Sequence, residues 1–191
     1  MSVRRPPVRA AVPADVPALA ALAAATFPLA CPPSTTAEAI AAHIATALHP
    51  GVIAGWVADP RCTVVVAPAG DGADGAGALD GYALATYGEC SDAEAAGSLV
   101  EAGVPRGPVH ELSKIYVRAE AHGGGLAGAL MEAAVAGARA AHGDGAVWLG
   151  TNGQNLRAQA FYRRHGFVTV GSRTYVVGGN PESDVVMLRR A

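Results

Sequence analysis

The first half of the chain carries apolar residues at helical spacing. Val16, Leu19, Leu22, Ala23 and Phe27 recur at three- and four-residue steps, which predicts a helix that Pro28 ends. A second set, Ile40, Ile44 and Leu48, predicts a helix that starts near Thr35 or Thr36, with Glu38 as a capping-box partner of Thr35. We expect this helix to end at Pro50-Gly51. Residues 8–12, just before the first helix, are expected to form a short strand.

The period changes at residue 62. Residues 62–67 read Cys-Thr-Val-Val-Val-Ala, and this β-branched run is typical of a strand. Residues 68–80 are rich in Gly, Ala and Asp and are predicted to be a loop, so residues 81–87 complete a long-looped hairpin. Residues 88–107 have no clear period, and their acidic residues indicate either a solvated loop or a short helix.

The second half alternates strands and helices. Strands are predicted at 110–117, 146–150, 167–170, 174–177 and 184–188, and helices at 125–142 and 155–165. The resulting order is β-α-α-β-β-β-α-β-α-β-β, in which the three closing segments 167–170, 174–177 and 184–188 count as two strands. It predicts an α/β (α+β) fold with a central mixed sheet, an antiparallel front half and helices on both faces. No break divides the chain, so residues 1–191 are expected to be a single domain.

Composition excludes several classes of function. The chain is 51% hydrophobic and 16% charged, with a mean hydropathy of +0.26, which excludes disorder. A net charge of −2 with scattered basic residues argues against nucleic-acid binding. The three cysteines form no CxxC, and no histidine stands at metal-ligand spacing from any of them. Neither a metal site nor a disulfide framework is therefore expected.

The segment before Cys31 resembles the leader of an exported lipoprotein. Arg4 and Arg5 precede an uncharged run that ends in Pro-Leu-Ala-Cys. Against this interpretation, Pro13, Asp15 and Pro17 interrupt the approach, and the run is weakly hydrophobic and too short to span a membrane. We expect a cytoplasmic protein that does not bind membranes, and keep export as an alternative.

A cluster of glycines marks the first candidate site. Gly123, Gly124 and Gly125 lie where a predicted strand meets a predicted helix. Backbone N–H groups at such a turn point in one direction, at the positive end of the helix dipole, and the small Ala127 and Gly128 let an anion approach. The chain lacks the lysine of a GxxxxGK[ST] loop and the glycine placement of a dinucleotide fingerprint. An ordinary turn in a chain with 24 glycines is the alternative.

A second motif lies about thirty residues later. Asn155 is a natural N-cap for the predicted helix 155–165, and Tyr162 follows almost two turns later. Taken alone, Tyr162 reads as a core aromatic. The remaining histidines gain no role from their spacing and are expected at the surface.

Together these stretches resemble the GCN5-related N-acetyltransferase (GNAT) superfamily. The acyl-CoA motif of that family, Q/R-x-x-G-x-G/A, corresponds to residues 122–127, with His122 in place of Gln or Arg. The pattern N-x-x-A-x-x-x-Y-x-x-x-G-F is met by residues 155–167 in full. The resemblance covers nearly the whole chain.

The resemblance implies a role for each matching position. Strand 111–117 would pair with the pantetheine arm through the backbone of Ile115, Tyr116 and Val117. The pyrophosphate of acetyl-CoA would bind to the turn His122, Gly123, Gly124, Gly125, Leu126, Ala127 and Gly128. Asn155 would contact the cofactor near its thiol, Tyr162 would protonate the leaving thiolate, and Glu111 would be the general base. No metal is implied.

The acceptor is less firmly indicated. Residues 111–117, 148–150, 171–178 and 184–187 look like the bacterial diamine/polyamine N-acetyltransferase branch, which implies a small primary amine as substrate. The acidic residues Glu89, Asp92 and Glu111 would attract such a cation. Acetylation of a protein amine and a non-catalytic acyl-CoA-binding module stay open. A homodimer is expected only by analogy with relatives.

Overall fold

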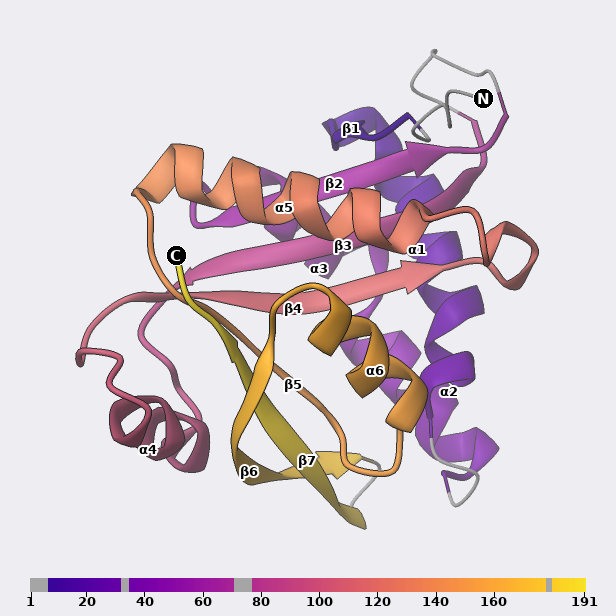
Figure 1. Cartoon of the computed structure of the whole chain (residues 1–191). Helices are drawn as coiled ribbons and strands as arrows, with labels where there is room; N and C mark the ends of the chain where they lie inside the picture. Colours follow the sequence, from indigo (N-terminus) through magenta and orange to yellow (C-terminus); the bar gives the residue numbers. More distant parts are fainter. Residues whose placement is uncertain (1–6, 32–34, 71–76, 178–179) are drawn as a thin grey trace.

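The computed structural model describes residues 7–31, 35–70, 77–177 and 180–191, and it contains one mixed sheet with helices on both faces (Figure 1). The strands are β1 (Arg9–Ala10), β2 (Cys62–Pro68), β3 (Leu79–Gly88), β4 (Val109–Val117), β5 (Val147–Asn152), β6 (Val168–Val177) and β7 (Asn180–Arg189). The α-helices are α1 (Val16–Thr26), α2 (Ala37–Ala47), α3 (Pro50–Ala58), α4 (Ala93–Glu101), α5 (Leu126–His142) and α6 (Leu156–Arg164). Short 3₁₀ turns cover Pro13–Asp15, Phe27–Ala30 and Ala119–Ala121.

The sheet has the order β1-β2-β3-β4-β5-β7-β6. Every neighbouring pair is antiparallel except β4 and β5. The predicted mixed sheet and its antiparallel front half are therefore confirmed. The central part of the predicted loop 68–80 lies outside the described residues.

The predicted element order is wrong at two helices. Pro50 begins α3 instead of ending the helical region, because proline suits the first turn and the His49 side chain accepts a hydrogen bond from the Gly51 N–H at 3.1 Å. The acidic segment 88–107 contains α4, which Asp92 caps by accepting from Ala95 N–H at 2.9 Å. Of the two interpretations of this segment, a solvated loop or a short helix, the structure shows the short helix, which the predicted order omits.

Two strand predictions also need correction. The strand expected at 8–12 is reduced to β1, because Pro13 begins a 3₁₀ turn. The strands expected at 167–170 and 174–177 form one strand, β6, with a register irregularity between Thr169 and Gly171 opposite β7. Val170 has no partner of its own in this pairing, whereas Gly171, Ser172 and Arg173 pair regularly with β7, so this stretch continues one strand and does not separate two.

The two faces of the sheet have separate cores. Helix α5 covers β2, β3 and β4 with Leu126, Leu130 and Ala134 turned inward, and α6 lies beside it on the same face (Figure 1). Helices α1, α3 and α4 cover the opposite face. Leu19 and Leu22 of α1 are fully buried against this face.

A β-bulge at Ser113 decides which side chains of β4 share a face. Lys114 lies opposite Leu84 of β3, whereas Leu112 lies opposite Ala85, so Ser113 has no partner of its own in this pairing. Glu111 and Lys114 consequently both lie on the α1 face, although three residues separate them. A regular strand would have placed them on opposite faces.

The pairing of β4 with β5 is brief. Only His110 with Val147 and Glu111 with Trp148 are in register, and beyond these pairs the strands diverge (Figure 1). The backbone edge of β4 after Glu111 is therefore free of β5, and a cleft opens in the middle of the sheet.

The apolar N-terminal region has the length of a membrane span. Within the described residues, the stretch Pro13–Ala30 is long and apolar enough to cross a membrane, with a mean hydropathy of 1.3. Helices α2 and α3 together also meet this criterion, as a pair bent by 45°. By length and composition alone, the expectation that the N-terminal run is too short to span is therefore wrong. Its helix packs in the core, however, and cleavage before Cys31 would remove both β1 and α1 from the fold.

Candidate active site

A cavity of about 820 Å³ follows the divergence of β4 and β5. We name its two ends by their residues. The glycine end is formed by residues 121–128 and the outer face of α6. The charged end carries Glu111, Lys114, Arg173, Glu182 and Asp184, and residues from the end of α1, the 3₁₀ turn Phe27–Ala30 and α2 close it.

The glycine end is a helix N-terminus without blocking side chains. Gly125 is the N-cap of α5 with a φ of 77°, and Gly123 has a φ of 86°, so both occupy the left-handed region that favours glycine. No acidic residue lies in the first turn of α5, and this turn begins a helix of 17 residues. The free N–H groups and the helix dipole make this end an anion site.

His122 is held by the backbone and not by an anion-binding geometry of its own. Its Nε2 lies 3.1 Å from the Val117 carbonyl oxygen, and its Nδ1 lies 3.4 Å from a terminal nitrogen of Arg157. An Nε2–H that donates to Val117 leaves Nδ1 to accept from Arg157. His122 therefore links the end of β4 to α6 and presents Arg157 beside the glycine turn.

Most predicted cofactor residues line the cavity, and they do so mainly through their backbone. The side chains of Val117 and Leu126 are buried under α5, and Ile115 packs against the same core. The exception is Gly124, which does not line the cavity because it is turned to solvent at the tip of the turn. Tyr116, Gly123, Gly125, Ala127 and Gly128 do line it, as does His122.

Asn155 caps α6 in the predicted way. Its Oδ1 accepts from Ala158 N–H at 2.9 Å, which leaves the Nδ2 amide hydrogens as its donors on the cavity wall. A carbonyl of a bound ligand would be a suitable partner for these donors.

Tyr162 lies in the middle of the cavity wall. Its ring packs edge-on against Phe161 and Phe167, with centroid distances of 5.3 and 5.8 Å, and this packing fixes its direction. Burial, with a smaller contribution from Tyr116, raises the pKa of Tyr162 well above its ordinary value of about 10. The hydroxyl is therefore protonated at neutral pH and can act as an acid.

Glu111 lies at the apex where β4 and β5 part. Burial raises the pKa of its carboxyl above the ordinary value, and Arg173 and Lys114 oppose this shift by their positive charge. A hydrogen bond with Thr86 lowers the pKa further, whereas Asp92 raises it. A carboxylate whose pKa is moved toward neutrality is a stronger proton acceptor than an exposed glutamate.

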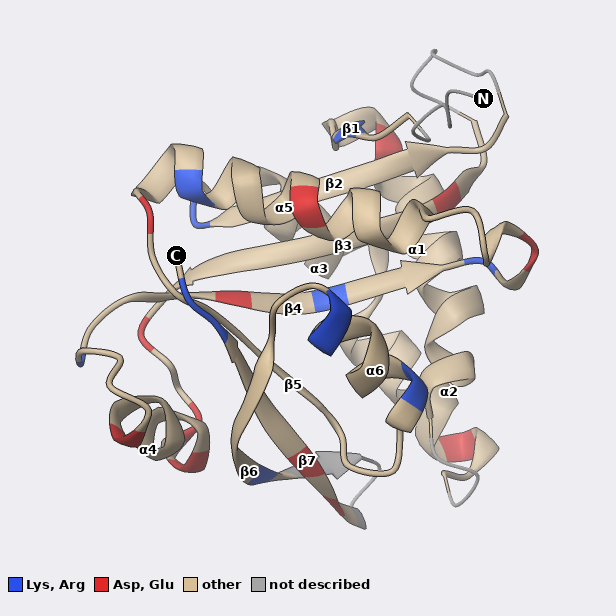
Figure 2. Ribbon diagram, viewed as in Figure 1, with Lys and Arg blue, Asp and Glu red and all other residues tan. Residues whose placement is uncertain are grey.

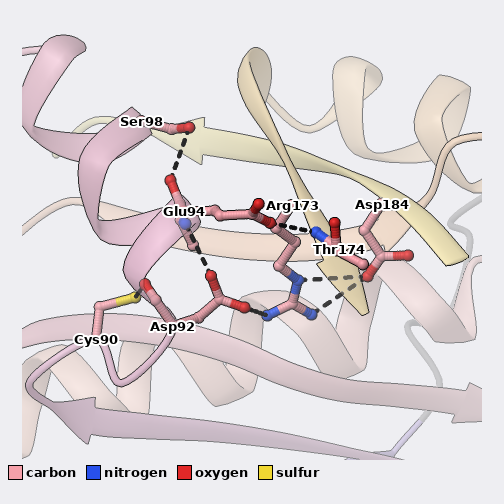
Figure 3. Close-up of polar contacts among 8 residues, drawn as sticks. Cys90, Asp92, Glu94, Ser98, Arg173, Thr174 and Asp184 are labelled. Atoms are coloured by element: carbon pink, nitrogen blue, oxygen red, sulfur yellow. Dashed lines mark hydrogen bonds and ion pairs between the residues drawn. The ribbon is translucent and has the colours of Figure 1, made fainter. Parts of the chain in front are cut away.

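An ion-pair network centred on Arg173 holds the residues of the charged end in place. Arg173 lies 3.3 Å from Asp184 and 3.6 Å from Asp92 (Figure 3). Its guanidinium lies 5.5 Å from the centre of the Trp148 ring. The network ties β6 and β7 to the N-terminus of α4. Gly150 makes room for it, since a Cβ there would overlap the Arg173 guanidinium.

The acidic residues of the 88–107 segment do not line the cavity. Asp92 pairs with Arg173 and caps α4, and Glu94 accepts from the Thr174 N–H (Figure 3). Neither Asp92 nor Glu89 contributes to the cavity wall. Of the three acidic residues expected near the site, only Glu111 lines the cavity, together with Glu182 and Asp184 of β7.

Several cavity residues escape prediction from the sequence. His43 and His165 line the cavity, contrary to the surface position expected for them, and His110 is buried in the sheet. Arg157 and Arg164 are seven residues apart on α6, and this spacing, which puts both on one face, could have revealed them. Figure 2 shows basic residues on α6 and acidic residues on α4. Nothing in the local sequence marks Glu182 or Asp184.

The cavity thus joins an anion site, a backbone edge, a proton acceptor and a proton donor. Glu111 and Tyr162 project from different elements into the same space. A ligand with a diphosphate at the glycine end and an extended arm along β4 would bring its far end between these two side chains. Among the described residues, no group of three or more His, Cys, Asp or Glu side chains could hold a metal ion.

Comparisons with known proteins identify relatives across the chain. The model of the acetyltransferase (GNAT) family matches residues 41–167. An uncharacterized N-acetyltransferase from Mycobacterium tuberculosis is 38% identical over 175 residues, which cover 92% of this chain and 97% of that protein.

Solved structures with low sequence identity share the fold. Arabidopsis thaliana NAA60 in complex with acetyl-CoA superposes with a TM-score of 0.70 at 16% identity, covering 96% of this chain and 97% of that one. The PaiA N-acetyltransferase from Thermoplasma acidophilum in complex with coenzyme A gives a TM-score of 0.68 at 15% identity, covering 97% and 98%.

Proposed function

The chain belongs to the GNAT family of acetyltransferases, and from this premise we propose that it transfers the acetyl group of acetyl-CoA to a primary amine of a small molecule. The observation that carries the proposal is the continuity of the cavity. One space runs from the helix N-terminus at Gly125, along the unpaired edge of β4, to Glu111 and Tyr162.

The glycine end fits the diphosphate of the donor. Its N–H groups, the absence of acidic side chains in the first turn of α5 and the nearby Arg157 and Arg164 all favour an anion. Arg157, which contacts His122 at 3.4 Å, would supply a positive charge beside the turn, where His122 replaces the Gln or Arg of the family motif. The donor arm would then lie along β4 at Ile115, Tyr116 and Val117.

Attack by the amine requires the loss of its proton. An alkylammonium with a pKa near 10 has no lone pair at neutral pH. Glu111, directly or through a water molecule, accepts that proton, and its raised pKa suits this role. A backbone N–H on the free edge of β4 would stabilise the oxyanion of the tetrahedral intermediate.

Collapse of the intermediate releases the thiolate. Tyr162 supplies a proton to the sulfur as the carbon–sulfur bond breaks, and the acetyl group remains on the amine nitrogen. Both substrates are present at once, so transfer is direct and needs no acetylated enzyme. Asn155 would orient the arm of the donor near its thiol through its amide hydrogens.

Small amines with a flexible chain are the natural acceptors for the charged end. The likeness to the diamine/polyamine branch makes diamines and polyamines the reference acceptors for this class. We further propose that residues 1–191 act as one catalytic domain, that the protein works in the cytoplasm, and that it forms a homodimer as relatives do. The homodimer rests on analogy alone, whereas the single domain rests on a sequence without a dividing break.

An amine panel tests the proposed function. Purified protein with acetyl-CoA is assayed for release of free thiol across diamines, polyamines, amino acids and aminoglycosides, with Tyr162→Phe as the matched variant. We expect turnover with at least one small amine and its loss in the variant. Binding of coenzyme A without turnover on any amine would favour a protein acceptor or a non-catalytic acyl-CoA-binding module.

A further inference from the structure

Lys114, the single lysine of the chain, faces the acceptor part of the cavity. The bulge at Ser113 places it on the same face of β4 as Glu111, on the side covered by α1 and α3. Its ammonium lies 5.2 Å from the ring centre of Trp56 and 3.5 Å from the Ser113 hydroxyl oxygen. Burial, with a smaller contribution from the charge of Lys114, lowers the pKa of His43, which also lines the cavity.

This ammonium has no carboxylate against it. Within the described parts of the chain, no acidic side chain approaches Lys114 to ion-pair distance, whereas Arg173 is paired with both Asp92 and Asp184. Burial lowers the pKa of Lys114, and the charge of Glu111 opposes that shift without an ion-pair contact. A cation with an aromatic ring and a weak hydroxyl contact as its neighbours would be stabilised by an incoming anion.

The charged end is therefore bipolar. Glu111, Glu182 and Asp184 form one side, and Lys114 stands toward α2 and α3 on the other. A second ammonium group of a diamine would lie near Lys114 and be repelled. A molecule with an amine at one end and a carboxylate at the other would match both sides.

We infer that Lys114 binds a carboxylate of the acceptor, so that the preferred substrates are aminocarboxylates rather than polyamines. The inference rests on the proposed acetyl transfer and narrows its acceptor. The amine of the acceptor would point to Glu111 while its carboxylate pairs with Lys114. A single ammonium on that side suits a monoanion better than a phosphate dianion.

The test compares acceptors that differ only in the anion. Initial rates with saturating acetyl-CoA are measured for amino acids and ω-amino acids, for their methyl esters, and for putrescine and spermidine. We expect kcat/KM for the carboxylate to exceed that for its ester by about 10- to 100-fold, which is the usual worth of a charged hydrogen bond. The diamines are expected to be poorer acceptors than the free acids.

Two variants assign the effect to Lys114. Lys114→Met keeps the length of the side chain and its packing on Trp56 but removes the charge, and it is expected to abolish the preference for the acid over the ester by raising KM for the acid. Lys114→Arg keeps the charge and is expected to retain part of the preference. Thermal unfolding of both variants shows that the fold is intact.

The outcomes separate the two proposals. Turnover with esters or diamines that equals or exceeds turnover with the acids, and an unchanged ratio in Lys114→Met, would overturn the inference while the acetyltransferase proposal stands. No thiol release with any amine would overturn the proposed function itself. If Lys114→Met does not fold, the ratio in Lys114→Arg and in the wild-type protein still decides the matter.

Discussion

The two ends of the cavity are built in different ways. The anion site of the glycine end comes from one contiguous segment, residues 121–128 beside α6, and acts through backbone N–H groups. The charged end is assembled from β4, β6, β7 and the α1–α2 region, and acts through side chains whose pKa values depend on one another. The first end is a local geometry, whereas the second exists only in the folded sheet.

This difference predicts which properties change when residues at each end are substituted. Backbone N–H groups recognise any diphosphate and depend on the conformation of the turn rather than on side-chain identity. The charged end depends on which residues face inward. We therefore expect substitutions at the charged end to alter chemistry and acceptor choice, and substitutions at the glycine end to alter stability and donor binding.

Replacing the proposed base has the largest expected effect. Glu111→Gln is expected to lower kcat/KM for the amine about 10²- to 10⁴-fold, because it removes the carboxylate that is proposed to accept the ammonium proton. The measurement is the pH profile of kcat/KM. In the wild-type protein kcat/KM should fall at low pH as Glu111 is protonated, and this acidic limb of the profile should vanish in the variant. Glu182→Gln, a second carboxylate of the same end, is the matched control and should keep that limb.

Stability distinguishes catalysis from a structural role for Glu111. Its folded pKa is raised, so its contribution to stability is greatest below the ordinary pKa of a glutamate and is lost as the pH rises through the folded value. At pH 8 the Glu111→Gln variant, whose side chain is neutral, should unfold at a temperature no lower than that of the wild-type protein. A large drop in melting temperature would indicate that Glu111 is structural.

The proposed acid should matter less than the base. Tyr162→Phe is expected to reduce kcat about 10²-fold, since a thiol with a pKa of about 8.5 leaves more easily than an amine loses its proton. The KM for acetyl-CoA should change little, because the ring keeps its packing against Phe161 and Phe167. Unchanged turnover at saturating acetyl-CoA would remove Tyr162 from the mechanism.

Gly124 and Gly125 provide a matched pair of substitutions at the glycine end. Gly125→Ala forces a left-handed residue to carry a Cβ and should cost about 1–2 kcal/mol of unfolding free energy. Gly124→Ala, which has an ordinary φ and open space around a Cβ, should cost less than about 0.5 kcal/mol. Denaturant unfolding measures both, and equal losses would mean that φ is not what selects glycine here.

The smallest expected effect concerns the tuning of Glu111. Thr86→Val removes a hydrogen bond that lowers the pKa of Glu111, so the acidic limb of kcat/KM should move to higher pH by a few tenths of a unit. Maximal kcat should remain near that of the wild-type protein. A limb that moves to lower pH would contradict the assignment of that limb to Glu111.

Local motifs carry most of what the sequence can predict. The turn at Gly123–Gly125, the cap at Asn155 and the strand that holds Glu111 are each specified within a few residues. The helix α3 is missed because proline both ends helices and suits their first turn, and the local sequence around Pro50 does not decide between the two. The strand order β4-β5-β7, which no local pattern encodes, brings Lys114, Glu182 and Asp184 to the same cavity.

The unpaired Ser113 has a consequence for how this strand can change over time. Removing one residue there would exchange the sides on which Glu111 and its upstream neighbours point, while the downstream edge that leads to the glycine turn kept its place. A single insertion or deletion at this position would thus change which side chains of β4 face the charged end, while the glycine end stayed as it is. Length variation in β4, more than point mutation, is where descendants of this protein would acquire a new substrate.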